Sequence, residues 1–114
     1  MMAEGYPNMK QWIDLPARSA AGVVYVAGGH VGDEFMVKIG WTTGNAQKRV
    51  ASMQTGCPIL IDLFKTIPVK GQGAEVFLHE HWSHLRQHGE WFACDDVMRA
   101  WVFDNSADFV GVNS

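Results

Sequence analysis

Two short runs of strand-forming residues, separated by a glycine-rich segment, constrain the fold of this chain most strongly. Val23–Ala27 reads VVYVA and Phe35–Trp41 reads FMVKIGW, and both runs are rich in β-branched and aromatic residues. The segment between them, GGHVGDE, has the glycines and acidic residues typical of a turn. The pattern predicts an antiparallel β-hairpin.

After the hairpin, the pattern changes to a helical spacing, in which Ala46, Val50 and Met53 share one stripe with Arg49. We expect a helix that is capped by Thr43 or Asn45 and ends at Gly56. Ile59–Val69 then predicts a third strand, which is buried along most of its length.

Two further helices are expected towards the end of the chain. Gly73–His88 carries an apolar stripe of Leu78, Trp82 and Leu85, and Gly89 marks its end. Asp95–Phe103 begins with aspartates, which the helix dipole favours in a first turn. The sequence therefore predicts an α+β fold, with a three-stranded antiparallel sheet flanked by helices in the order β-β-α-β-α-α.

The length of 114 residues is enough for one domain with a single core. We expect an N-terminal arm over 1–21, in which Trp12 docks onto the domain, then the domain over 22–103 and a tail over 104–114. No apolar run is long enough to cross a membrane, and the first residues lack the pattern of a secretory signal. These features predict a cytoplasmic protein in which Cys57 and Cys94 are reduced.

The net charge of −3 does not by itself indicate a nucleic-acid-binding protein. The charges are unevenly distributed, however, because residues 35–74 contain five basic side chains and one acidic side chain, Asp62. A basic middle of this kind fits a surface that meets a polyanion, and ordinary scatter of surface charge fits it equally well.

Several short motifs resemble those of the GIY-YIG endonuclease superfamily, in the branch common in phages and mobile elements. The resemblance covers residues 22–92, with VVY at Tyr25 and KIG at Lys38 as its first two motifs. Arg49, Glu75 and the sequence GEWF at the end of this region complete the match. The resemblance implies an endonuclease that hydrolyses DNA phosphodiester bonds with Mg²⁺ or Mn²⁺, with Glu75 as the metal ligand.

The residue types suit this chemistry. Hydrolysis of a phosphodiester needs a base for the attacking water and positive charge beside the phosphate oxygens. Tyr25 is a candidate base if a nearby cation stabilises its phenolate, and Lys38, across the hairpin, is a candidate for that cation. The structural alternative is that Tyr25 is a half-buried aromatic residue and Lys38 a solvated strand residue.

Arg49 has a planar fork of donors that can bind two phosphate oxygens of the phosphorane. Glu75 and His79 are four residues apart and share one helix face, so His79 is a further catalytic candidate, which could bind phosphate, orient water or hydrogen-bond to Glu75. Glu90 could brace the site or cap the preceding helix. Thr42 and Lys48 are candidate contacts to the substrate backbone.

Two functions from different classes remain open. The first is a metal-dependent DNA endonuclease that uses Tyr25, Lys38, Arg49 and Glu75. The second is a catalytically weak or inactive module of the same fold that binds DNA or a host protein. The sequence does not determine the oligomeric state or the pathway.

Overall fold

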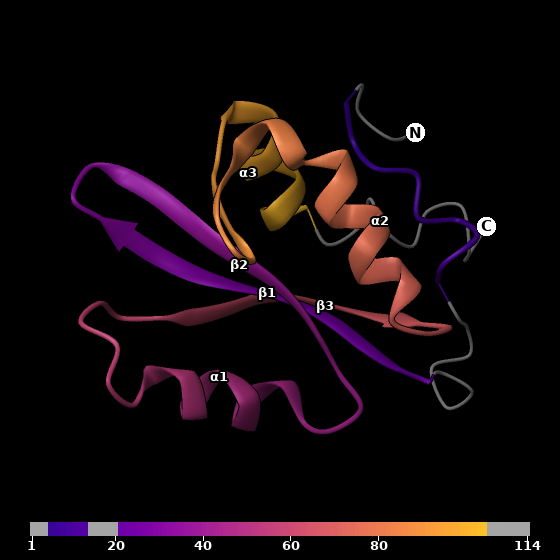
Figure 1. Ribbon diagram of the computed structural model, residues 1–114, viewed down its shortest axis with the longest axis horizontal. Coiled ribbons are helices and arrows are strands. Elements are labelled where there is room, and N and C mark those ends of the chain that lie inside the picture. The colour runs from indigo at the N-terminus through magenta and orange to yellow at the C-terminus, as the bar shows by residue number, and fades with distance from the viewer. Residues whose placement is uncertain (1–4, 14–20, 105–114) are drawn as a thin grey trace.

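The computed structural model describes residues 5–13 and 21–104. Its centre is a five-stranded antiparallel sheet with strand order β3-β1-β2-β5-β4. The elements in chain order are β1 (Gly22–Val31), β2 (Glu34–Thr42), α1 (Ala46–Gln54), β3 (Asp62–Val69), α2 (Gly73–His81), the 3-10 turn η2 (Ser83–Leu85), β4 (Arg86–His88), β5 (Trp91–Ala93) and α3 (Asp96–Phe103). Figure 1 shows α1 on one side of the sheet and α2 and α3 on the other.

The predicted hairpin is confirmed, but its strands are longer than expected. The turn is only two residues long, since Val31 pairs with Glu34, and Gly32 adopts a positive φ of 62° within it. Gly28 and Gly29 lie inside β1, although the sequence suggests a turn there. A Cβ on Gly28 would lie 2.0 Å from the carbonyl oxygen of Met36. These glycines therefore permit a close backbone approach within the sheet.

The expected three-stranded sheet and the order β-β-α-β-α-α are wrong, because η2 and strand β4 replace the end of the predicted helix over 73–88 and a further strand, β5, follows it. Helix α2 ends at His81, and the chain then forms η2, β4 and β5. Gly89 has a positive φ of 58° in the β4–β5 turn. A left-handed glycine ends helices and also forms hairpin turns, so its presence fits both interpretations. Pairing of β5 with β2 decides between them.

The predicted helices α1 and α3 are confirmed within one or two residues at their ends. Asn45, one of the two expected caps, accepts a hydrogen bond from the Lys48 N–H at 3.0 Å. Asp95 caps α3 in the same way, through the Met98 N–H at 2.8 Å. Each cap satisfies a backbone donor that has no partner within its helix.

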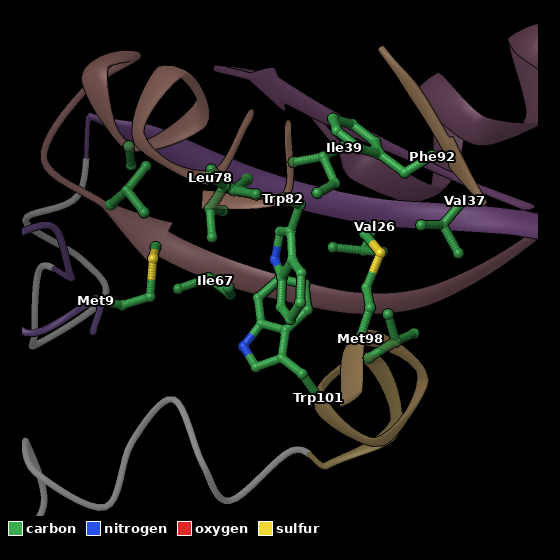
Figure 2. Packing of buried hydrophobic residues seen from close by; sticks show 14 of the residues in the cluster. Met9, Val26, Val37, Ile39, Ile67, Leu78, Trp82, Phe92, Met98 and Trp101 are labelled. Carbon is green, nitrogen blue, oxygen red and sulfur yellow. The ribbon is translucent and has the colours of Figure 1, made fainter. Parts of the chain in front are cut away.

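The larger core lies between the sheet and helices α2 and α3 (Figure 2). Trp82 and Trp101 pack at its centre with ring centroids 5.6 Å apart. Trp82 is the residue directly after α2 and is 1% exposed. Its burial orients the chain where α2 gives way to η2 and β4. A smaller cluster around Tyr25, Ala27, Val50 and Ile61 fills the α1 side of the sheet.

The described part of the N-terminal arm docks onto the domain. Trp12 stacks on Phe77 with ring centroids 5.8 Å apart, and Ile13 forms a bridge with Val69. The rest of the predicted arm, 1–4 and 14–20, and residues 105–114 of the predicted tail lie outside the described residues. Among the described residues, no helix has the length and apolar character needed to span a membrane.

Candidate active site

The site forms where the ladder between β2 and β5 ends. The Ile39 N–H donates to the carbonyl oxygen of Glu90 at 3.2 Å, just before β5 begins. The carbonyl oxygen of Ile39 lies 2.8 Å from Nε2 of His79, which belongs to α2. The backbone of Ile39 is thus hydrogen-bonded both to the β4–β5 turn and to a side chain of α2. This arrangement brings side chains from three separate parts of the chain together.

Glu75, His79 and Glu90 form a cluster that could hold a metal ion. One ligand atom from each residue lies within 4.8 Å of the other two. Because a carbonyl oxygen can only accept, His79 must donate its Nε2–H to Ile39, and the neutral ring then has a lone pair on Nδ1. A metal-binding histidine commonly donates its other ring N–H to a backbone carbonyl in this way.

Glu75 is the buried member of the cluster, with 8% of its surface exposed. Desolvation raises the pKa of its carboxyl group above the usual value, and the negative charge of Glu90 raises it further. His79, a hydrogen bond from Gln72 and Lys38 act in the opposite direction. A buried carboxylate beside a second carboxylate is destabilised when charged, and a bound cation would relieve this cost.

Tyr25 lies on the opposite face of the sheet, the face that α1 covers, near the end of the β2–β5 ladder. It lies opposite Gly40 in the β1–β2 register and is 1% exposed. A Cβ on Gly40 would lie 2.3 Å from Cζ and 2.4 Å from the hydroxyl oxygen of Tyr25. The ring therefore lies across the space that a side chain at residue 40 would occupy. Gly40 is required for this position of the hydroxyl group.

Arg49 of α1 completes the site from the α1 side. Its hydrogen bond with Tyr25, and its charge interaction with the same group, raise the pKa of the guanidinium, with a smaller contribution from Glu90. A guanidinium has no acceptor, so Arg49 donates to the Tyr25 oxygen. The Tyr25 O–H is directed to Sδ of Met53 at 3.8 Å, which is a weak acceptor.

Lys38 lies on the same face of the sheet as Tyr25, because residues 38 and 40 alternate with the buried Val37 and Ile39 of the other face. Its ammonium group is 4.0 Å from the Glu90 carboxylate. The cation that hydrogen-bonds to Tyr25 is thus Arg49, whereas the sequence suggested Lys38 for this place.

The two predicted backbone contacts are not part of the carboxylate–histidine cluster. The Thr42 hydroxyl accepts a hydrogen bond from the Gly44 N–H at 3.0 Å. Lys48 is exposed in the first turn of α1. Thr42 is the last residue of β2 and Lys48 lies in the first turn of α1, so the two residues flank the connection between these elements, and their roles stay predictions.

The cluster fits a hard divalent cation with few protein ligands. Two oxygens bound directly to one Mg²⁺ lie at most about 4.2 Å apart, since each bond is about 2.1 Å long. The cluster, at up to 4.8 Å, is slightly wider than this limit. A small rotation of one side chain, or a water between one ligand and the ion, would accommodate the difference, and Mg²⁺ usually keeps several waters.

Glu90 is the residue whose importance the sequence reasoning underestimated. It lies 15 residues after Glu75 in the chain, and the expected helix over 73–88 gave no reason to bring the two carboxylates together. The β4–β5 turn does so. The motif GEWF was the available signal, because an acidic residue between a turn glycine and two aromatic residues fits a polar group held at the edge of a core.

Comparison with known proteins corrects the family expected from the motifs. No curated protein and no solved structure is significantly similar to the chain. A family model matches residues 22–105, which include every strand and helix of the domain, and it describes the T5orf172 domain. The expected membership of the GIY-YIG endonuclease superfamily, which rested on short separate motifs, is therefore wrong. The chain belongs to the phage-associated T5orf172 domain family.

Proposed function

We propose that this protein is a nuclease that hydrolyses DNA phosphodiester bonds with one divalent cation. The observation that carries the proposal is the cluster of Glu75, His79 and Glu90 beside the hydrogen-bonded pair of Tyr25 and Arg49. A cation site next to a phenol and a guanidinium contains the groups that phosphodiester hydrolysis requires.

Each residue has a defined role in this proposal. Glu75, His79 and Glu90 hold the cation. When bound, the cation supplies positive charge that stabilises the departing alkoxide. Tyr25 acts in its phenolate form, which accepts the proton of the attacking water and becomes the neutral phenol, and the Arg49 guanidinium stabilises the negative charge of the phenolate through its hydrogen bond.

Arg49 and Lys38 also provide the positive charge that binds the substrate. Arg49 is exposed on α1, so its remaining donors are open to the phosphate oxygens of the phosphorane. Lys38 is held near the cluster by its ion pair with Glu90. Lys48 and Thr42 extend this surface as contacts to the DNA backbone, which fits the excess of basic residues over 35–74.

The test is nicking of supercoiled plasmid by the purified protein with Mg²⁺ or Mn²⁺, and with a chelator. We expect metal-dependent nicking that Tyr25→Phe lowers about 10²- to 10⁴-fold, the usual range for loss of a general base. Glu75→Gln should raise the metal concentration needed for activity. Glu80→Gln is the matched control, because Glu80 is an exposed glutamate of the same helix.

A second function has its own support. The ion pair between Lys38 and Glu90 satisfies a ligand carboxylate without a metal, and the net charge of the chain is −3. The ion pair suits a module that binds DNA or a host protein and does not cut, and the negative net charge favours a host protein as the partner. Absence of nicking with either metal, or nicking that Tyr25→Phe and Glu75→Gln leave unchanged, would favour this function over the nuclease.

A further inference from the structure

An apolar groove lies on the α1 side of the sheet, directly beside the candidate active site. Its volume is about 210 Å³. The groove is lined by Val31, Met36, Cys57, Pro58, Ile59 and Trp91. These residues come from the β1–β2 hairpin, from the segment between α1 and β3, and from the start of β5.

Residues that line the groove are neighbours of residues in the active site, both along the chain and across the sheet. Trp91 is the Cα partner of Lys38 in the β2–β5 ladder, and it packs with the cluster that contains Tyr25. Trp91 also follows Glu90, a member of the metal-ligand cluster. Met36 is two residues before Lys38 on the same face of β2, a distance of about 6.8 Å along an antiparallel strand. The groove thus begins next to Lys38 on the same face of the sheet, and Lys38 is one of the residues proposed to bind the phosphate.

The wall of the groove opposite the hairpin is held by hydrogen bonds. Gln54, the last residue of α1, donates its side-chain N–H to the Ile59 carbonyl oxygen and accepts from the Ile61 N–H, both at 2.8 Å. The carbonyl oxygen of Leu60 lies 2.2 Å from the position of a Cβ on Gly29. The segment is therefore clamped to α1 and rests against β1, so the groove is formed before any ligand binds.

The charge distribution favours one kind of occupant. The described residues that line the groove carry no charged side chain. Lys38 is the Cα partner of Trp91, and Arg49 interacts electrostatically with Glu90, the residue before Trp91, so both positive charges lie towards the Trp91 side of the groove. A ligand that matches this surface has an apolar, flat part and a negative group attached at one end. A nucleotide has this form, and bases stack well on aromatic side chains such as Trp91.

We propose that the groove holds one nucleobase of the DNA strand, stacked on Trp91, while the neighbouring phosphate lies at Lys38 and Arg49. This inference rests on the proposed function and specifies which form of DNA is the substrate. A base inside a duplex cannot reach a groove in the protein, so the bound nucleotide must be unstacked. The preferred substrate is consequently single-stranded, frayed or distorted DNA.

The experiment uses a short single-stranded oligonucleotide with 2-aminopurine, a fluorescent base analogue quenched by stacking, scanned through successive positions. Binding is measured by anisotropy in Ca²⁺, and cleavage separately in Mg²⁺ or Mn²⁺. The compared proteins are the parent, Trp91→Leu, Trp91→Phe and the control Leu60→Ala. Leu60 is 82% exposed and adjoins the groove without lining it.

We expect quenching at one position, and Trp91→Leu should abolish it and weaken binding about 5- to 150-fold, the range for loss of one stacked base. Trp91→Phe, which keeps an aromatic face, should restore most of the affinity, and Leu60→Ala should behave as the parent. An abasic residue at the quenched position should weaken binding to the parent but add no further loss in Trp91→Leu. Thermal unfolding verifies that each variant is folded.

The outcomes separate the inference from the proposed function. Cleavage by the parent without quenching, or equal binding by the parent and a folded Trp91→Leu, overturns the groove assignment and leaves the nuclease intact. Position-specific quenching without cleavage supports the groove and rejects the nuclease. Absence of both DNA binding and cleavage rejects both. Self-association that Trp91→Leu abolishes would assign the groove to a second copy of the chain instead.

Discussion

Replacing Gly40 with alanine is the most direct test of how the site is built. The new methyl carbon would lie 2.3 Å from Cζ of Tyr25, whereas ordinary contact begins near 3.4 Å. The ring must therefore move by about 1 Å. Displacement of a catalytic group by about 1 Å can cost on the order of 10²-fold in rate, and we expect a loss of this size in plasmid nicking.

The effect of Gly40→Ala on stability should be smaller than its effect on activity. Overpacking costs about 1–3 kcal/mol, and the lower chain entropy of unfolded alanine returns about 0.5–1 kcal/mol of this. Urea unfolding should then show a net loss of about 0–2.5 kcal/mol, with the same m-value as the parent. The variant remains folded while its tyrosine is misplaced.

Two controls make the test specific. Gly44→Ala introduces the same methyl group four residues later, where the nearest atom is Thr42 Oγ1 at an ordinary 3.7 Å, and it should keep parental activity. Adding Gly40→Ala to Tyr25→Phe should cause little further loss of activity, because the group that it displaces is already absent. The reasoning is refuted if Gly40→Ala nicks plasmid as fast as the parent, or if the two substitutions act independently.

Three further predictions concern protonation and capping. Since burial and Glu90 raise the pKa of Glu75, the metal-free protein should lose stability as pH rises through that pKa. Glu75→Gln should flatten the dependence of Tm on pH. An unchanged dependence would contradict the raised pKa of Glu75. Burial raises the pKa of Cys94 to about 12, so only about one thiol in 10⁴ is ionised at pH 8. Mass spectrometry should therefore find Cys94 almost unmodified by iodoacetamide until denaturant is added, and rapid native labelling would contradict its burial. Asp95→Ala should lower the free energy of unfolding by about 1 kcal/mol through loss of the α3 cap, whereas Asp96→Ala, one residue into the helix, should cost less in the same urea titration.

The sequence alone determined the elements whose signals are local. Runs of β-branched and aromatic residues on either side of a turn-like segment identified the β1–β2 hairpin. A cap at Thr43 or Asn45 marked the start of α1, and aspartates favoured by the helix dipole marked the start of α3. Helical spacing placed Glu75 and His79 on one face. These inferences succeeded because each depends on residues within a few positions of one another, which interact through the backbone geometry of a single element.

Tertiary structure decided the features that depend on distant contacts. Strand β5 exists because residues 91–93 pair with 36–38, about 55 positions earlier, and no local signal in GEWF distinguishes this strand from a loop. The same pairing brings Glu90 to Glu75 and Lys38, and the approach of α1 to the sheet gives Arg49, instead of Lys38, the hydrogen bond to Tyr25. A side chain's neighbours across a sheet are set by register and by the packing of the core, and only the folded chain has either.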